Sequence, residues 1–281
     1  GDATVVNDAG LNFHASTVGG NLAATATTGN MTDSGTVTVG GNLAAITDAN
    51  NGVINLGTLA VDGSVSLHTH GSGNATVVND AGLEFAASTV RGTLSATATA
   101  GNITDSGNLA VTGTSSFTTS ASNATITLND TNAFAGAVAL NTTGSSANAL
   151  IDNGTTALDL AASSVGGNLT LTSGHASGIT DSGTVTVGGN LAATTDDNNG
   201  VINLGTLEVD GTVALVTHRT GNATVVNDAG LDFAASTVGG NLVATATTGN
   251  MTDSGALTIA GTSSFTTSAN NARIALDTTT N

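Results

Sequence analysis

Two acidic turns contain the side chains best suited to bind a metal ion. One is the Asp-Asp-Asn-Asn-Gly run at residues 196–200, and the other is the related run at residues 47–52. Carboxylate and amide oxygens clustered in a turn suit a hard cation such as Ca²⁺. The same letters also describe an Asn-Gly turn with exposed aspartates, and this structural interpretation is the favoured one. Asp48, Asp196 and Asp197 are therefore weak Ca²⁺ candidates, and no other metal or cofactor is predicted.

Two histidines, His68 and His70, stand two residues apart. Side chains at that spacing lie on one face of a strand, where they can hold a metal ion together. The corresponding residues 148 positions later are Val216 and His218, so the pair is not repeated. A fortuitous polar pair is the favoured interpretation.

The two glutamates do not form a fixed catalytic pair. Glu84 corresponds to Asn12 or Asp232 in the other repeats, and Glu208 corresponds to Ala60. Both are predicted to lie on the solvated surface. Polysaccharide-cleaving β-helices need convergent acids with a base or Ca²⁺, and usually aromatic residues that stack on sugars. We therefore expect no enzyme, and a carbohydrate-binding or carbohydrate-active β-helix protein is the alternative.

Four aspartates, Asp33, Asp105, Asp181 and Asp253, occupy equivalent positions in the repeats. If the repeats stack as coils of a β-solenoid, three coils separate one of these aspartates from the next. Three coils rise by roughly 14 Å, which is too far for two of them to share one Ca²⁺ ion.

The composition predicts an ordered, acidic protein. Hydrophobic residues make up 39% of the chain and alternate with Thr, Ser and Asn, whereas disordered chains lack such residues. The formal net charge is −17, with three arginines and no lysine. Such a chain repels polyphosphate backbones, so nucleic acid is excluded as a partner. No apolar stretch approaches the length of a membrane span, so membrane insertion is not expected.

Internal repeats in the sequence indicate which secondary-structure elements position these residues. Residues 31–78 return almost unchanged at 179–226, and residues 73–107 return at 221–255. Within this repeat, an apolar anchor before a Gly-containing corner recurs at a shorter and a longer spacing. The shorter spacing, near 22, is the length of one solenoid turn. The anchors are Val18, Val39, Val61, Val90, Val111, Phe134, Val165, Val187, Val209, Val238 and Ile259.

Period-two alternation of apolar residues on both sides of each anchor predicts two short strands. A third strand precedes the anchors of the shorter coils, as at residues 31–33 and 179–181, so one coil is expected to have about three faces. In the longer coils an extra segment such as residues 74–82 either lengthens a face or forms an outward loop. Asparagines three residues after the anchors are expected to hydrogen-bond between coils, as in cross-β ladders.

Residue volumes give a separate test of coil stacking. Where the inward position becomes Phe117 or Phe265, the inward position two residues earlier falls from Leu to Ser. The preceding coils offer Ala96 and Ala244 beside those rings if the coils stack in register. This exchange of large and small residues is what a close-packed shared core requires.

The predicted fold is all-β, a single-stranded parallel β-helix or solenoid of about 11 coils of 21–31 residues in three-coil superunits of about 73 residues. One continuous helix is expected over residues 1–281, as an internal segment of a longer repeat protein. The expected superunits are about 18–89, 90–164, 165–237 and a partial one at 238–281.

The run Gly-Gly-Asn-Leu, followed by Ile-Thr-Asp-Ser-Gly-Thr-Val-Thr-Val at residues 179–187, resembles the β-helical repeats of filamentous-haemagglutinin-type exoproteins and giant bacterial surface adhesins. The resemblance covers essentially the whole chain. It implies a right-handed parallel β-helix, secretion through a two-partner or autotransporter-like route, and work as a surface fibre, adhesin or matrix component.

The predicted function is therefore the structural shaft of an extracellular bacterial fibre or adhesin, located outside the cell or on its surface. Expected partners are other copies of the chain, through end-to-end or lateral association, and surface glycans or other cells. A small β-sandwich in each superunit is disfavoured, because the period near 22 is too short and no core aromatic recurs in each unit.

Overall fold

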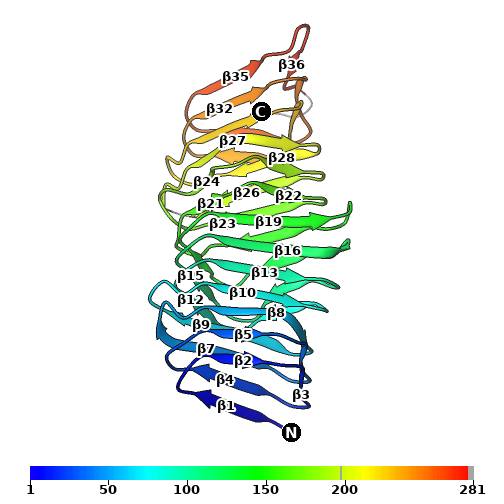
Figure 1. Ribbon diagram of the computed structural model, residues 1–281. Helices are drawn as coiled ribbons and strands as arrows, with labels where there is room; N and C mark the ends of the chain where they lie inside the picture. Colours follow the sequence, from blue (N-terminus) through cyan, green and yellow to red (C-terminus); the bar gives the residue numbers. More distant parts are fainter. Residues whose placement is uncertain (197, 278–281) are drawn as a thin grey trace. The chain divides into compact units, whose positions relative to one another are not determined.

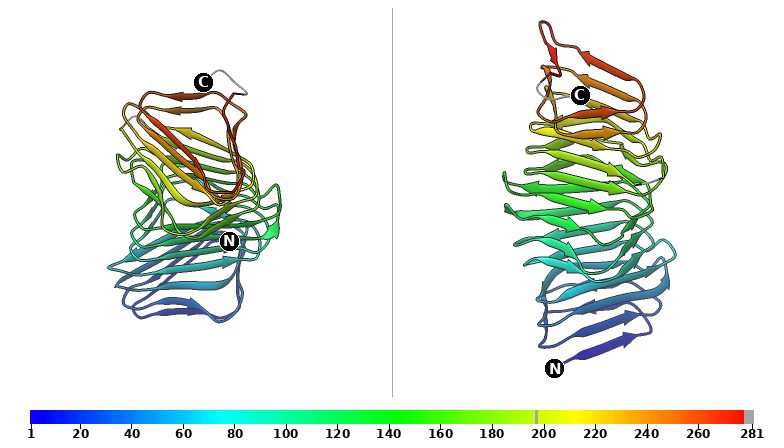
Figure 2. Two further views of the ribbon diagram at one scale, coloured as in Figure 1. Left: turned by 90° about the horizontal axis from the view of Figure 1, so that it is seen from above. Right: turned by 180° about the vertical axis from the view of Figure 1, so that it is seen from behind.

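The computed structural model describes residues 1–196 and 198–277. This part of the chain contains strands, turns and bends, with no helix. It is an all-β parallel solenoid of about 13 turns, and its contacts divide into two compact units, residues 1–141 and 142–281. Figures 1 and 2 show the strands of each unit stacked in parallel in two facing sheets. No described segment has the helical length and hydropathy of a membrane span.

The first unit has two sheets whose strands all pair in parallel. The first sheet contains β1 (Ala3–Asn7), β4 (Leu22–Ala26), β7 (Leu43–Asn50), β9 (Ser64–His70), β11 (Leu83–Phe85), β12 (Ser88–Val90), β14 (Ile103–Asp105), β15 (Leu109–Val111), β17 (Ile126–Leu128) and β18 (Ala133–Phe134). The second sheet contains β2 (Leu11–Phe13), β3 (Ser16–Val18), β5 (Met31–Asp33), β6 (Val37–Val39), β8 (Ile54–Val61), β10 (Ala75–Asn79), β13 (Leu94–Ala98) and β16 (Ser115–Ser122). The next strand, β19 (Val138–Thr143), includes the boundary between the units.

The second unit repeats this arrangement. One sheet contains β20 (Ala149–Asp152), β23 (Leu169–Ser173), β26 (Leu191–Thr195), β28 (Thr212–Val216), β30 (Leu231–Phe233), β31 (Ser236–Val238), β33 (Met251–Asp253), β34 (Leu257–Ile259) and β36 (Ile274–Ala275). The other contains β21 (Leu158–Leu160), β22 (Ser163–Val165), β24 (Ile179–Asp181), β25 (Val185–Val187), β27 (Ile202–Val209), β29 (Ala223–Asn227), β32 (Leu242–Ala246) and β35 (Ser263–Thr267).

Each turn places its alternating apolar residues between the two sheets. In β13, for example, Leu94, Ala96 and Ala98 are buried while Ser95 and Thr97 point outward. Successive side chains of a strand point to opposite faces, so the period-two pattern of the sequence directly separates core from surface. Each unit therefore has one narrow apolar interior shared by all of its turns.

The expectation of about three faces per turn is corrected to two sheets. The turns do contain three strands where the sequence predicted them, as in β4, β5 and β6, but β5 and β6 belong to the same sheet. The eight-residue strand β8 pairs with both of them. The two short strands thus belong to one sheet, and a single longer strand can take their place in the next turn.

The long coils expected from the anchor spacing are each one and a half turns. In the first unit, Ala3 pairs with Leu22, Leu22 with Leu43, and Leu43 with Val65, which completes three turns on one sheet. Ala75, the repeat equivalent of Ala3, follows half a turn later on the other sheet. The extra segment is therefore neither a longer face nor a loop, because its central part is the complete strand β10.

This half turn corrects the count of about 11 coils to about 13. Register partners on neighbouring turns are separated by similar lengths of chain, as in the pairs Ala3–Leu22 and Ile103–Ile126. One long repeat spans three and a half such turns, so equivalent strands of successive repeats lie on opposite sheets. The coil count from the sequence used only the corners that follow the anchors and contain glycine. The additional half turns have different corners, so they were not counted.

The predicted exchange of large and small core residues is confirmed. Phe117 lies in register with Ala96, and Ser115 with Leu94; in the second unit Ala244 pairs with Phe265 and Leu242 with Ser263. The ring of Phe117 also meets Phe85 and Phe134 of the opposite sheet edge-on, with centroids 6.2 and 5.5 Å apart. Such T-shaped contacts are favourable beyond the area they bury.

Candidate functional site

The most distinctive local feature shared by the two units is a bulge in an eight-residue strand, β8 in the first unit and β27 in the second. In the first unit β8 and β10 pair at Leu56–Val77 and again at Leu59–Asn79, so Gly57 and Thr58 face one residue of the neighbouring strand. The second unit has the same irregularity between Leu204 and Leu207 of β27. A bulge leaves ladder hydrogen bonds unmade, so its backbone N–H groups need other acceptors.

An aspartate of the preceding turn supplies those acceptors. The carboxylate of Asp33 accepts the backbone N–H of Gly57 at 3.0 Å and that of Thr58 at 2.7 Å. Asp181 accepts the equivalent N–H groups of Gly205 and Thr206 at 2.8 and 2.7 Å. The first and third of the recurrent aspartates therefore hold a bulge of the next turn.

A buried asparagine completes the bulge from the following turn. Asn79 is 1% exposed; its Oδ1 accepts the N–H of Val61 at 2.8 Å, and its Nδ2 donates to the carbonyls of Val61 and Gly82. Asn227 makes the same bonds in the second unit. Because every polar atom of these amides is bonded, their burial is compatible with a stable core.

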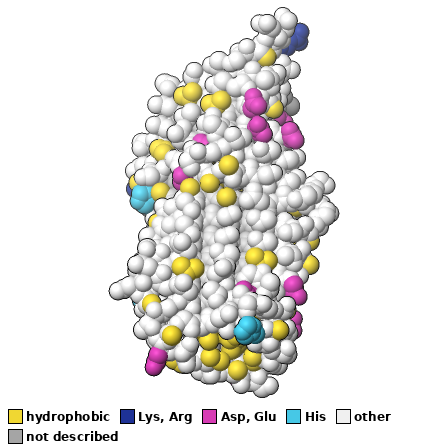
Figure 3. Space-filling view, viewed as in Figure 1, with side chains coloured by type: hydrophobic (Ala, Val, Ile, Leu, Met, Phe, Trp, Pro, Cys, Tyr) yellow, Lys and Arg dark blue, Asp and Glu magenta, His cyan; other side chains and the backbone are white. Residues whose placement is uncertain are grey.

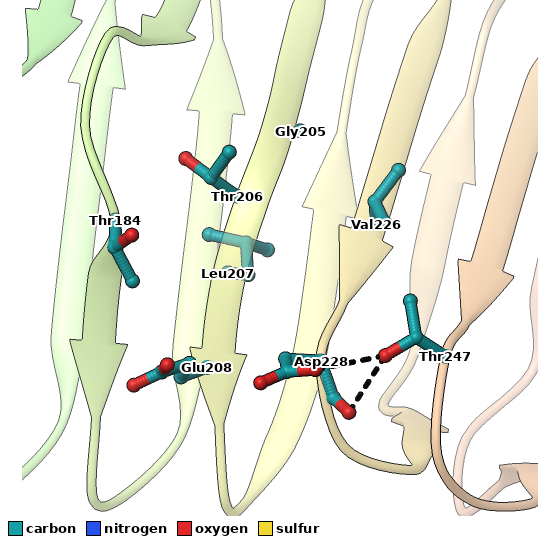
Figure 4. Close-up of a pocket in the computed structure, with 8 residues that line it drawn as sticks. All are labelled: Thr184, Gly205, Thr206, Leu207, Glu208, Val226, Asp228 and Thr247. Atoms are coloured by element: carbon teal, nitrogen blue, oxygen red, sulfur yellow. Dashed lines mark hydrogen bonds between the residues drawn. The ribbon is translucent and has the colours of Figure 1, made fainter.

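Shallow open grooves lie over the bulges. In the second unit the groove has a volume of about 240 Å³, and Figure 4 shows the carboxylates of Glu208, on β27, and of Asp228, directly after β29, at its lower end. Thr247 donates to Oδ1 of Asp228 at 2.9 Å, and Thr186 donates to Glu208 at 2.8 Å. The equivalent groove of the first unit, of about 250 Å³, has Ala60 in place of the glutamate.

A second pair of grooves follows directly along the chain. Asp62 and Glu84 line this groove in the first unit, and Asp210 and Asp232 line the equivalent one in the second unit, each with a volume of about 340 Å³. The rest of each lining is Thr, Asn, Gly and small apolar residues. Figure 3 shows a face on which charged side chains are few and scattered among uncharged atoms.

The predicted Ca²⁺ residues are placed as follows. Asp48 is about half exposed on β7, and its Oδ1 lies 4.0 Å from Nδ1 of His70. Asp196 is exposed in the turn after β26, and Asp197 lies outside the described residues. Within residues 1–196 and 198–277, no group of three or more His, Asp or Glu side chains is arranged to hold a metal ion. Calcium binding at these positions stays a prediction.

His68 and His70 both lie on the outer side of β9, on either side of the inward Thr69. Nδ1 of His70 is 2.9 Å from the carbonyl oxygen of Thr47 in the preceding turn. The sequence thus placed the two rings on one face, as expected. It missed the contact between His70 and Asp48, because these residues are brought together by the stacking of turns.

The other predicted acids do not converge with these residues. Glu84 and Glu208 are exposed, as expected. Asp105, the second recurrent aspartate, accepts hydrogen bonds from Asn129, Asp130 and the Asn132 amide. Burial raises the pKa of Asp105 above its ordinary value of 3.8, although these hydrogen bonds oppose the shift.

The asparagines after the anchors do bond between turns, but to the backbone of the next turn and not to a like side chain as in a cross-β ladder. Oδ1 of Asn21 accepts the backbone N–H of Asn42 at 2.8 Å, and Oδ1 of Asn42 accepts that of Ser64 at 3.0 Å. Asn168 and Asn190 make the same contact in the second unit. These ladders run beside the corner glycines, where space is so limited that a Cβ on Gly63 would lie 2.6 Å from the carbonyl oxygen of Gly41.

Comparison of the sequence with known families finds four consecutive matching segments, residues 1–68, 72–141, 146–206 and 220–281. All four match the family described as Repeats of unknown function (DUF5649). The chain belongs to this family. Searches of curated proteins and of solved structures found no match.

The DUF5649 segments agree with the structural period. Each segment contains one copy of the strand that begins the repeat, and these copies, β1, β10, β20 and β29, alternate between the two sheets within each unit. The segments begin earlier in the repeat than the expected superunits, which were counted from the anchors. That the four DUF5649 segments form one continuous helix stays a prediction.

Sequence reasoning missed the bulge and the residues that hold it. A signal was present, since Leu-Gly-Thr-Leu at residues 56–59 and 204–207 breaks the strict alternation of the strand. A break of two residues between inward positions is typical of a bulge. The partner in the preceding turn is not identifiable in this way, because its distance along the chain depends on the length of the turn.

Proposed function

We propose that this chain is a structural shaft segment of an extracellular bacterial fibre or adhesin, as in the filamentous-haemagglutinin-like proteins it resembles. It gives length and stiffness, and it performs no catalysis. The observation that carries the proposal is that polar groups are used to join one turn to the next. The bonds of Asp33, Asn79 and the Asn21–Asn42 ladder all run between neighbouring turns.

The differences between the long repeats also support a scaffold role. Inward Leu67 is retained as Leu215, while the adjacent outward His68 becomes Val216. Of the buried core positions in residues 31–78, only Met31 changes, to the similarly apolar Ile179. Among described residues, the other changes lie on the outside or in corners, at positions 46, 60, 64, 66, 68, 71 and 72. A constant core with a variable exterior suits a rod that presents different surfaces.

The proposed localisation is outside the cell, and the proposed partners are other copies of the chain and components of other cell surfaces. The net charge of −17 would keep long assemblies soluble by self-repulsion. Because equivalent strands alternate between sheets, a shaft of these repeats would present each repeated surface on two opposite sides.

Electron cryomicroscopy of the native material tests the proposal. Three and a half turns at about 4.8 Å each predict an axial rise of about 17 Å for every DUF5649 repeat, without gaps between repeats. An unbroken rod with this rise on isolated cell-surface material is the expected result. Compact particles, or beads joined by visible linkers, would contradict the shaft.

A carbohydrate-binding protein is the second candidate, favoured by the recurrence of equivalent acidic grooves in the two units. Binding of soluble oligosaccharides, measured by calorimetry, should then be weakened by Asp210→Ala and by Asp62→Ala in separate variants. Binding that is unchanged in both variants would exclude these grooves as the sugar sites.

A further inference from the structure

The outer surface of β9 carries two imidazoles that can reach one ion. His68 and His70 flank Thr69, which is 2% exposed, so both rings leave the strand on its outer side. Residues two apart on a strand are separated by about 6.6 Å. Two imidazoles attached at that separation can converge on a single metal ion, at the bond length of about 2.0–2.1 Å that nitrogen ligands take.

The ring of His70 is already oriented for such a role. Its Nδ1 lies 2.9 Å from the carbonyl oxygen of Thr47, and a carbonyl can only accept, so Nδ1 carries the proton. In the neutral ring Nε2 then holds the lone pair. The Asp48 carboxylate lies on the same Nδ1 side, 4.0 Å away. Metal-binding histidines are commonly held by a carbonyl or carboxylate at the other nitrogen.

The stacking of turns produces this arrangement. Strands β7 and β9 pair at Ile46–His68 and again at Asn50–His70, so three residues of β7 face one residue of β9. Regular pairing continued from Ile46–His68 would place Asp48 opposite His70. With the irregularity, both the Thr47 carbonyl and the Asp48 carboxylate lie near Nδ1 of the His70 ring.

We propose that His68 and His70 form a surface site for a transition-metal dication of the Zn²⁺, Ni²⁺ or Cu²⁺ class. Nε2 of His70 and a ring nitrogen of His68 are the protein ligands, and water completes the coordination. Imidazole suits these ions, whereas Ca²⁺ takes oxygen ligands. In this site the Thr47 carbonyl positions His70, and Asp48 adds negative charge beside the ring, in place of the calcium role expected for it.

The second unit contains a natural comparison. Nδ1 of His218 lies 2.6 Å from the carbonyl oxygen of Thr195, so this imidazole is oriented like that of His70. The residue two positions earlier is Val216 instead of histidine. The second unit therefore has one oriented ring without its partner, and it should not bind the ion at the concentrations that fill the first site.

Calorimetric titration of the full chain with Zn²⁺ tests the site. Wild type should bind one ion per chain, and His68→Val, which copies the second unit, should bind at least tenfold more weakly. Val216→His should add a second ion per chain. His14→Gln, a change outside the pair, should bind like wild type, and far-ultraviolet circular dichroism should show that all variants are folded.

Either of two results would overturn the proposal. One is Zn²⁺ binding by His68→Val with the affinity and stoichiometry of wild type, which would place the ion elsewhere. The other is a folded Val216→His variant that binds no additional ion, which would show that two imidazoles in this geometry are insufficient.

Discussion

Asp33 and Thr58 are joined by two hydrogen bonds across neighbouring turns. Oδ2 of Asp33 accepts the backbone N–H of Thr58 at 2.7 Å and its hydroxyl at 2.8 Å. Asp181 and Thr206 repeat both bonds in the second unit. A side chain of one turn thus takes the place of the missing ladder bonds in the next.

Replacing Asp33 by alanine should lower the free energy of unfolding by about 1–3 kcal/mol, because the bulge loses hydrogen bonds to a charged acceptor. Asp33→Asn keeps one acceptor oxygen and should lose less. Urea unfolding followed by circular dichroism measures the difference. Asp62→Ala removes an exposed carboxylate nearby and serves as the control; an equal loss in this control would show that the bulge contact is not the cause.

The free energy of unfolding should depend on pH through Asp105. Its pKa is higher in the folded chain than the ordinary 3.8, with burial as the main cause, so the folded state binds the proton more tightly than the unfolded state. The contribution to stability is therefore complete below pH 3.8 and is lost as the pH rises through the raised pKa. Unfolding curves of wild type and Asp105→Asn should diverge across that window. Parallel pH profiles would contradict the assignment.

Two buried serines should respond to alanine with opposite signs. The Ser115 hydroxyl is buried without a hydrogen-bond partner, and an unsatisfied group of this kind costs about 1–3 kcal/mol. The Ser88 hydroxyl accepts the N–H of Leu67 and donates to the carbonyl of Ala86. Ser115→Ala should raise the thermal unfolding midpoint and Ser88→Ala should lower it. Shifts of the same sign would refute the distinction.

The half-turn arrangement predicts a specific disulfide. Thr76 of β10 and Ser95 of β13 are outward register partners, about 4.8 Å apart as neighbouring strands, within the range that a disulfide spans. Because the chain has no cysteine, the double variant Thr76→Cys/Ser95→Cys should close one disulfide on mild oxidation, seen by non-reducing mass spectrometry. Thr76→Cys/Thr97→Cys, about 8 Å apart along the diagonal, should remain reduced. If residues 74–82 formed a loop, neither pair would be favoured.

Much of the core could be predicted from particular residues. The alternation around Val39 and Val61 identified inward and outward positions, and the exchange of Leu for Ser115 beside Phe117 indicated stacking in register. These predictions succeed because a strand separates its two faces locally, with a period of two residues. Register in turn follows from volume, since a shared narrow core admits a large ring only beside a small residue.

The candidate sites were less accessible to such reasoning. The sequence identified Asp48, His68 and His70 as residues of interest, but the one-turn spacing between Asp48 and His70 was not recognised as a contact. Asp33 was recognised as a repeated position and was considered only as a metal ligand, while its partner Thr58 lies 25 residues later. Contacts between turns depend on turn length and on bulges, and both vary along this chain.

The amino-acid sequence alone determined the all-β parallel solenoid, its long internal repeat and the composition of its core, because these follow from local alternation and from repetition. Only the tertiary structure decided that each repeat occupies three and a half turns and that equivalent strands alternate between sheets. The physical reason is that a half turn leaves the pattern of inward and outward residues unchanged. A strand with this alternation fits either sheet. Only its pairing with strands of the neighbouring turns shows to which sheet it belongs.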